Sequence, residues 1–110
     1  MKAVLYEPEN MHLLIRIKSK KKYLDEMISE VYKTIAPTHK EEGCLEYRVF
    51  HKEQEIVIFG TWKNLMLLDM HQLLQFHVYL VEDVLPKMSK KFSLQVYKEL
   101  EPPITALSIG

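Results

Sequence analysis

The stretch CLEYRVFHKEQEIVIFGTW, residues 44–62, contains two strand patterns separated by a charged segment. Its first part alternates in character, with Leu45, Tyr47 and Val49 on one face, and a period of two predicts a β-strand. The segment KEQE at residues 52–55 predicts a hairpin loop, and IVIFGTW predicts a second strand that is apolar on both faces. We therefore expect a β-hairpin in the middle of the chain.

A strand and a helix precede this hairpin. MHLLIRIK at residues 11–18 nearly alternates and predicts a strand. The following KKKYLDEMISEVYKTIAP predicts a helix that Pro37 ends, because proline interrupts a helical interior. A polar turn, HKEEG, then leads to the hairpin, with Gly43 as its flexible point. The apolar residues of the helix recur at helical spacing, at Leu24, Met27, Ile28, Val31 and Ile35.

A second helix and a last strand follow the hairpin. Asn64 is a good N-cap for a helix over LMLLDMHQLL, residues 65–74. Further helical turns over FHVYLVEDVL run to Pro86, and FSLQVYKEL at residues 92–100 predicts the last strand.

The resulting order of strand, helix, strand, strand, helix, strand is the split βαβ pattern of ferredoxin-like folds. It predicts an α+β protein with a four-stranded antiparallel sheet and two helices on one face. We expect a single domain over residues 1–110, with its core at about 11–100 and a tail at each end.

This topology makes the first and last strands antiparallel neighbours. It therefore brings the lysine-rich KSKKK at residues 18–22 close to Lys90 and Lys91. Such a cluster of lysines attracts anionic ligands. Alternatively, it forms a solvated edge that discourages pairing with other sheets.

The strand at residues 56–59 also predicts how the helix-free face of the sheet is covered. It is apolar on both faces, whereas a half-solvated strand alternates more cleanly. Leu14, Phe50 and Tyr97 add apolar side chains to the same surface. We expect a homodimer that packs through this sheet face. The alternative is a lone domain covered by an extra segment such as the N-terminal AVLY.

Composition excludes several classes of function. Fifteen basic residues balance fifteen acidic ones, and the only arginines are Arg16 and Arg48, a poor set for recognising nucleic acid. Cys44 is alone, so neither an intrachain disulfide nor a cysteine metal cluster can form. No segment has the length and apolarity of a signal peptide or membrane span. We expect a cytoplasmic protein without membrane or nucleic-acid partners.

Three segments carry a resemblance to a known family. EEGCLEYRVF resembles the Glu-x-Gly-Cys segment that opens the second strand in the antibiotic biosynthesis monooxygenase family, a dimeric α+β barrel group. IFGTWKNLMLLDMH is similar to that family's strand-end Trp, helix and His, and VLP resembles its closing turn. The family's second His usually follows the first by about five residues. Here Phe76 holds that place and His77 comes one residue later, so either the turn carries an insertion or the pocket-facing His is missing.

The resemblance implies an activity and leaves alternatives. It implies a cofactor-independent monooxygenase that acts on a small aromatic or quinol-type molecule, and we expect no cofactor and no bound metal. One alternative is a haem-binding or haem-degrading member, for which Asn10, Trp62 and a histidine would face the haem. Another is a dimer that binds a small ligand without turning it over, or an isomerase of a small metabolite.

Cofactor-free oxygenation needs an apolar pocket, a base and a partner for the developing oxyanion. His71 and His77 are the catalytic candidates, because the imidazole pKa lies near neutrality. Packing histidines are the alternative reading. One straight helix would not place both histidines on the same face, because their spacing is neither three nor four residues. The same spacing argues against a zinc site formed by two histidines of one helix.

The candidate substrate-binding residues are those that offer a flat wall, a hydrogen-bond donor or an adaptable apolar surface. They are Trp62, Tyr47, Asn64, Met66 and Tyr79. For Trp62, a place in the core is the alternative to a pocket wall.

Overall fold

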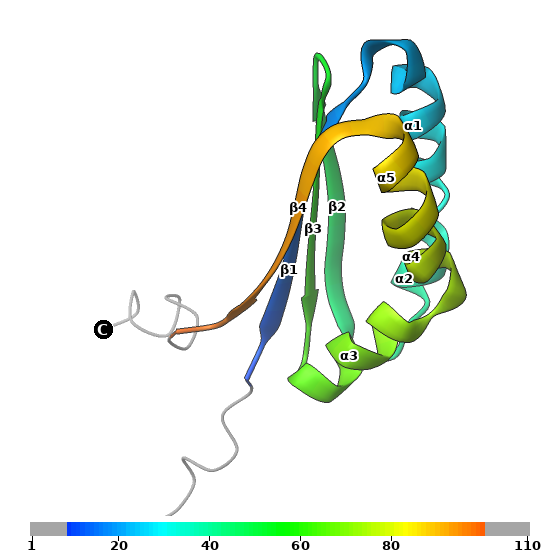
Figure 1. The fold of residues 1–110 in the computed structure, drawn as a ribbon. Helices are drawn as coiled ribbons and strands as arrows, with labels where there is room; N and C mark the ends of the chain where they lie inside the picture. Colours follow the sequence, from blue (N-terminus) through cyan, green and yellow to red (C-terminus); the bar gives the residue numbers. More distant parts are fainter. Residues whose placement is uncertain (1–8, 101–110) are drawn as a thin grey trace, which may run out of the picture.

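The computed structural model describes residues 9–100, which form a four-stranded antiparallel sheet with every helix on one face (Figure 1). The strand order is β2-β3-β1-β4, which confirms the predicted ferredoxin-like topology. The strands are β1 (Met11–Ser19), β2 (Cys44–Lys52), β3 (Glu55–Trp62) and β4 (Ser89–Lys98). The predicted covering segment AVLY and the tail at 101–110 lie outside the described residues.

The helical layer is divided into short segments. The first connection carries η2 (Lys21–Tyr23), α1 (Leu24–Tyr32) and α2 (Ile35–His39). The second carries α3 (Leu65–Leu73), α4 (Gln75–Tyr79), the π-helical η3 (Leu80–Val84) and α5 (Leu85–Met88). No helix in the described part of the chain is long and apolar enough to cross a membrane.

Three predicted boundaries are wrong. The first helix is interrupted before Ile35, where a separate helix, α2, begins. Pro37 lies inside α2 and does not end it, because Pro37 is in the first turn, where the amide groups have no partner within the helix. The hairpin loop is only Glu53 and Gln54, with Glu53 at a φ of 55°. The last strand begins at Ser89, three residues earlier than expected, because its first residues pair with the end of β1.

The core lies between the sheet and the helices, as the alternation of β1 predicts. Leu13, Ile15 and Ile17 are fully buried against the helices. Ile15 faces Ile58 of β3 on one side and Leu94 of β4 on the other. This continuous apolar layer stabilises the packing of the helices on the sheet. Burial of apolar surface contributes a free energy of about 25 cal/mol for each Å² removed from water.

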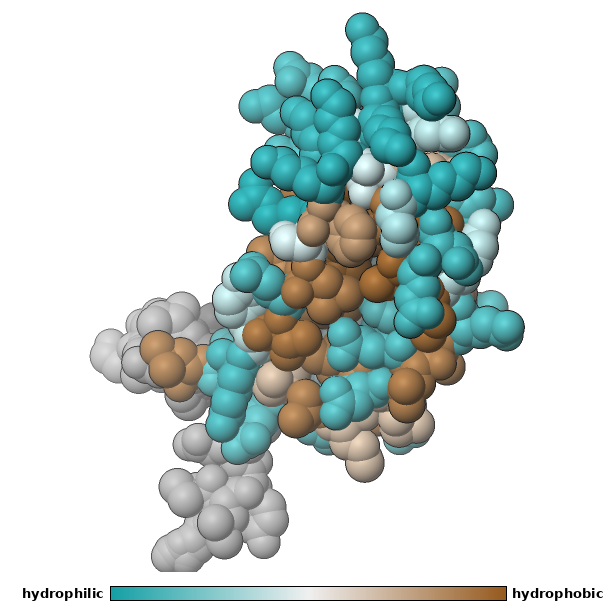
Figure 2. Space-filling view, in the orientation of Figure 1, coloured by the Kyte–Doolittle hydropathy of each residue, from teal (hydrophilic) through white to brown (hydrophobic). Residues whose placement is uncertain are grey.

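The other face of the sheet carries no helix in residues 9–100 (Figure 1). We call it the open face. Its centre is apolar and partly exposed, with Leu14 and Phe59 in register and Phe50 opposite Val57. Figure 2 shows hydrophilic residues gathered at the end of the molecule that carries the β2–β3 turn and η2. The open face therefore has an apolar centre and a polar end.

Candidate active site

The candidate site begins with a turn that brings Glu41 under helix α3. Gly43 has a φ of 86°, a left-handed conformation that favours glycine. A Cβ at this position would lie 2.2 Å from Leu67 Cδ1, so any other residue would force the Leu67 side chain of α3 to shift. The Gly43 carbonyl also accepts a hydrogen bond from the Lys63 amide at 2.9 Å, which joins the turn to the start of α3.

Glu41 accepts hydrogen bonds from two side chains of the core. Its Oε1 lies 3.1 Å from Trp62 Nε1, and its Oε2 lies 2.7 Å from His71 Nδ1. Trp62 and His71 are almost completely buried. Because the carboxylate accepts at Nδ1, that nitrogen carries the proton in the neutral imidazole, and Nε2 keeps its lone pair.

The free nitrogen of His71 is the unusual feature of this cluster. His71 Nε2 is buried and has no hydrogen-bond partner among residues 9–100. A buried polar atom without a partner is uncommon in folded proteins and is frequently explained by a catalytic role or a bound molecule. A carboxylate-oriented imidazole with a free lone pair has the arrangement of a general base.

A break in the helical layer brings His77 to His71. Leu74 is extended, with φ −68° and ψ 142°, and it ends α3 and caps α4. The chain changes direction there, and the two imidazole rings lie 4.7 Å apart between centroids. The six-residue spacing of His71 and His77 would keep them apart on one straight helix. They lie on two helices, α3 and α4, so that restriction does not apply.

Burial keeps both histidines neutral. It lowers the pKa of His71, although the Glu41 carboxylate opposes the shift. Burial, with a smaller contribution from His71, lowers the pKa of His77 to about 4. At neutral pH His71 is therefore unprotonated at Nε2 and able to accept a proton.

Tyr47 and Trp62 complete an aromatic wall around His71. The Trp62 ring centroid lies 4.5 Å from that of His71, and the Tyr47 centroid lies 6.1 Å away. The Thr34 hydroxyl donates its hydrogen to the Val31 carbonyl at 2.7 Å. The Tyr47 hydroxyl lies 2.9 Å from Thr34 Oγ1, and it is therefore the donor in the bond between Tyr47 and Thr34. Burial raises the pKa of Tyr47, which keeps the phenol protonated.

A hollow of about 250 Å³ lies beside this cluster, between α1 and the α4–η3 segment. Thr34, Phe76 and Tyr79 are among the residues that line it. The Phe76 ring also makes an edge contact with His71, with centroids 5.8 Å apart. The Phe76 side chain thus connects the hollow to the imidazole ring of His71. Phe76 faces the hollow at the position where the family usually has its second His, and His77 faces His71.

The structure brings together four of the predicted site residues, namely Tyr47, Trp62, His71 and His77. Tyr79 is half exposed and lines the hollow. Asn64 is exposed, and its side-chain oxygen caps α3 by accepting from the Leu67 amide at 2.9 Å. Met66 is 63% exposed on α3. No described contact joins either of these two to the cluster.

Sequence reasoning missed Glu41. Glu41 lies in the predicted polar turn, and it is also the glutamate of the Glu-x-Gly-Cys segment on which the resemblance depends. That motif was therefore the available signal. Thr34 was also missed, and nothing in its sequence context distinguishes it from an ordinary helix residue. Phe76 was noted only as the residue in place of the family's second His, and its contact with the hollow was not predicted.

Comparison with known proteins now decides the family. A family model for antibiotic biosynthesis monooxygenases matches residues 10–77, more than half of the chain. The chain belongs to the antibiotic biosynthesis monooxygenase family. A search of curated proteins finds no match.

Solved structures agree with this family on the fold. Protein SO0527 of Shewanella oneidensis superposes with a TM-score of 0.80 at 16% identity, over 84% of this chain and 93% of that one. Rv0793 of Mycobacterium tuberculosis gives 0.78 at 17% identity, over 84% and 97%. A solved antibiotic biosynthesis monooxygenase gives 0.72 at 18% identity, over 84% and 99%. At these identities the similarity shows the fold alone.

Proposed function

We propose that this member of the antibiotic biosynthesis monooxygenase family is a cofactor-independent monooxygenase of small phenols and quinol-type aromatics. The observation that carries the proposal is the buried lone pair of His71 Nε2, with Nδ1 held by Glu41. A base in this arrangement removes the proton of an electron-rich phenol, such as a quinol or an anthrol, and the resulting anion can transfer an electron to dioxygen directly. General-base catalysis contributes a factor of about 10² to 10⁴ in rate.

The reaction balances without an added reductant. His71 Nε2 takes the phenol proton, and the phenolate gives one electron to O₂, forming a phenoxyl radical and superoxide. These combine at an ortho or para carbon that carries hydrogen, which forms a C–O bond, and the peroxide takes up the proton from His71. The O–O bond then breaks, and the ring hydrogen leaves with the distal oxygen as water. Phenol and O₂ therefore give a quinone and one water.

Substrate in this scheme enters through the hollow between α1 and α4. Phe76 lines the hollow and touches His71, so its side chain moves aside to let a substrate hydroxyl reach Nε2. Tyr79 offers a flat surface in the lining of the hollow, and Tyr47 and Trp62 lie beyond it, against His71. An aromatic substrate suits this lining, because ring–ring contacts favour offset or edge-to-face packing.

We also propose that the protein works as a homodimer through the open face. Leu14, Val57 and Phe59 are partly exposed there, and Phe50 and Tyr97 are each 48% exposed. An apolar patch of this kind on a sheet is typical of an interface between subunits. The resemblance to a dimeric barrel group supports the same arrangement.

Oxygen uptake in ¹⁸O₂ tests the activity. Purified protein would be mixed with anthrone and with 1-naphthol, whose para carbons are free, and the product quinone would be weighed by mass spectrometry. We expect enzyme-dependent uptake, one labelled oxygen in the quinone and no hydrogen peroxide. His71→Ala should abolish the reaction, and His51→Ala, which changes an exposed histidine, should not.

Two outcomes would contradict the proposal. Uptake that releases hydrogen peroxide and leaves the quinone unlabelled would indicate an oxidase. No uptake, together with saturable binding of the same phenols, would indicate a binding module. Addition of haemin in parallel checks the haem alternative, which requires a shifted Soret band that disappears in His71→Ala or His77→Ala.

A further inference from the structure

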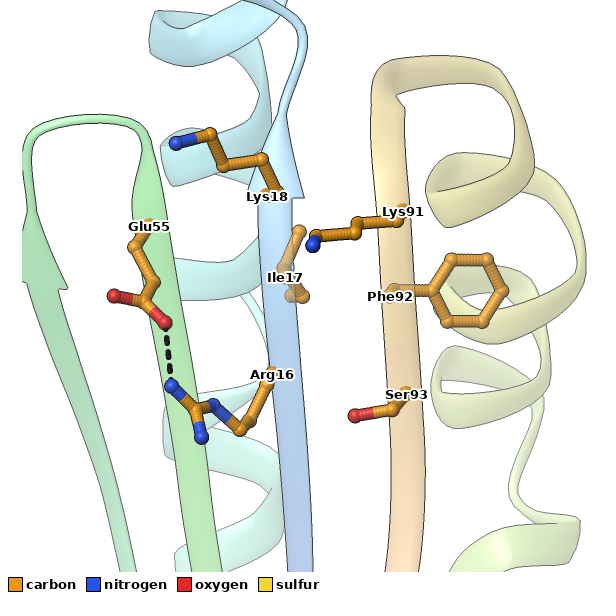
Figure 3. Close-up of a pocket in the computed structure, with 7 residues that line it drawn as sticks. All are labelled: Arg16, Ile17, Lys18, Glu55, Lys91, Phe92 and Ser93. Atoms are coloured by element: carbon orange, nitrogen blue, oxygen red, sulfur yellow. Dashed lines mark hydrogen bonds and ion pairs between the residues drawn. The ribbon is translucent and has the colours of Figure 1, made fainter.

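A second hollow, of about 550 Å³, lies at the polar end of the open face (Figure 3). Arg16 and Lys18 of β1, Glu55 of β3, and Lys91 and Ser93 of β4 contribute to its lining. The candidate active site is elsewhere. Lys18 pairs with Glu55 at one end of the β1–β3 ladder, and Met11 pairs with Trp62 at the other end.

The charges around this hollow do not cancel. Arg16 Nη2 lies 2.9 Å from Glu55 Oε2, so the one carboxylate of the lining already has a cationic partner. Neither Lys18 nor Lys91 has a carboxylate within 4.0 Å in residues 9–100. The pKa of Glu55 is lowered mainly by Arg16, and Lys18 and Lys52 add to the effect, as expected beside an excess of positive charge.

The two unpaired lysines are opposite each other in the backbone register, although Figure 3 shows the Lys18 side chain turned toward β3. Lys18 and Lys91 are register partners in the antiparallel β1–β4 ladder. Like charges in this position repel and destabilise a strand pair. Figure 3 shows the Lys91 side chain reaching from β4 toward β1, with the Ser93 hydroxyl also directed across the hollow. A bound anion would convert this repulsion into two attractions.

We propose that this hollow binds a small polyanion, either a diphosphate or a polycarboxylate, between Lys18 and Lys91. Ser93 supplies an additional donor on the β4 side, next to Lys91, and Arg16 adds a positive charge on the β3 side, where it keeps its bond to Glu55. Lysine ammonium groups bind phosphate and carboxylate as compact point charges, and the volume suits a small metabolite. The inference is independent of the proposed oxygenase, because it uses no residue of the Glu41–His71 cluster. It requires that the polar end of the open face stays accessible in the proposed homodimer.

Calorimetric titration of the full chain with pyrophosphate and with citrate tests the site. We expect saturable binding that weakens as salt is added. Lys18→Gln and Lys91→Gln should each weaken binding about tenfold, which is the loss expected for one charge-assisted hydrogen bond. Lys90→Gln is the matched control, since it removes the same charge one residue away in β4. Binding of pyrophosphate alone identifies phosphate as the ligand chemistry, and binding of citrate alone identifies carboxylate.

Two results would overturn the proposal. One is the absence of binding by either anion at low salt. The other is an equal loss of affinity in Lys90→Gln and Lys91→Gln, which would mean a diffuse positive field instead of a site. Light scattering on each variant, with and without the anion, confirms that any change in affinity is not a change in oligomeric state.

Discussion

Glu41 and His71 lie thirty residues apart in sequence, and their side chains meet at 2.7 Å in the core. The same carboxylate accepts from Trp62 through its other oxygen. One glutamate therefore sets both the tautomer of the histidine and the position of the indole. The free Nε2 of His71 is the consequence on which the proposed chemistry depends.

The double role of Glu41 predicts a measurable loss of stability in Glu41→Gln. The side-chain amide has only one oxygen, so either His71 or Trp62 keeps a buried N–H without its acceptor. We expect the free energy of unfolding, measured in urea, to fall by about 1–3 kcal/mol. Glu42→Gln is the matched control, because Glu42 is exposed and adjacent. Equal stability of the two variants would mean that the carboxylate does not hold the cluster.

The buried imidazoles predict that stability decreases in mild acid. The pKa of His77 is about 4 in the folded protein, against about 6.5 in an unfolded chain. The unfolded state therefore binds the proton first, and stability is complete above pH 6.5 and declines as the pH falls toward 4. We expect His77 alone to contribute a loss of about 2 kcal/mol between about pH 7.5 and about pH 5.

Urea unfolding at the two pH values checks this dependence. His77→Gln should flatten the decline, and His51→Gln, at an exposed site, should leave it unchanged. The lowered pKa of His71 acts in the same direction, so some dependence remains in His77→Gln. An unchanged decline in His77→Gln would contradict the lowered pKa of His77, because a group with the same pKa in both states adds no pH dependence to stability.

The open face predicts that Phe59→Glu separates the subunits. Phe59 lies at the centre of this face, in register with Leu14 and stacked on His12 at 5.5 Å. A carboxylate there would be desolvated in a sheet-to-sheet interface, at a cost of several kcal/mol. Light scattering should give a dimer for the unaltered chain and a folded monomer for Phe59→Glu. Tyr32→Glu, on the helix side and 72% exposed, should remain dimeric. A Phe59→Glu protein that is folded and still dimeric would contradict the sheet-to-sheet arrangement.

Asn64 separates a capping role from a ligand role. Its side chain accepts from the Leu67 amide, so Asn64→Ala should lower the free energy of unfolding by about 1 kcal/mol. Asn64→Asp retains the acceptor and should restore stability. If Asn64 only caps α3, both variants keep the oxygen-uptake rate of the unaltered chain per folded molecule. A loss of uptake in the fully stable Asn64→Asp would support the sequence-based assignment of Asn64 to the substrate.

The strands and the core could be predicted from sequence because their signals are local. The alternation of Leu13, Ile15 and Ile17 gives both the strand and its buried face. Tyr47 and Trp62 could be proposed as site residues because aromatic side chains at such places combine apolar surface with a polar group. These features depend on residue type and period alone.

The histidine cluster could not be predicted in the same way. Glu41 stands in a charged turn, where a glutamate is ordinarily solvated, and its contacts depend on the tertiary approach of α3 over Gly43. The sequence predicts that one helical segment ends at residue 74 and that further turns follow, but no glycine or proline indicates the change of direction at Leu74 that brings His71 and His77 together. Both features arise from packing between elements distant in sequence.

The most direct test of the proposed base is the pH dependence of kcat/KM for oxygen uptake, measured on the unaltered chain and on Glu41→Gln. The base must be unprotonated, so activity should fall as the pH drops through the pKa of His71, which burial places below its usual value. Glu41 raises that pKa, so Glu41→Gln should move the acidic limb to lower pH while reducing the rate about 10–100-fold. An acidic limb at the same pH in both proteins would contradict the assignment of His71 as the base oriented by Glu41.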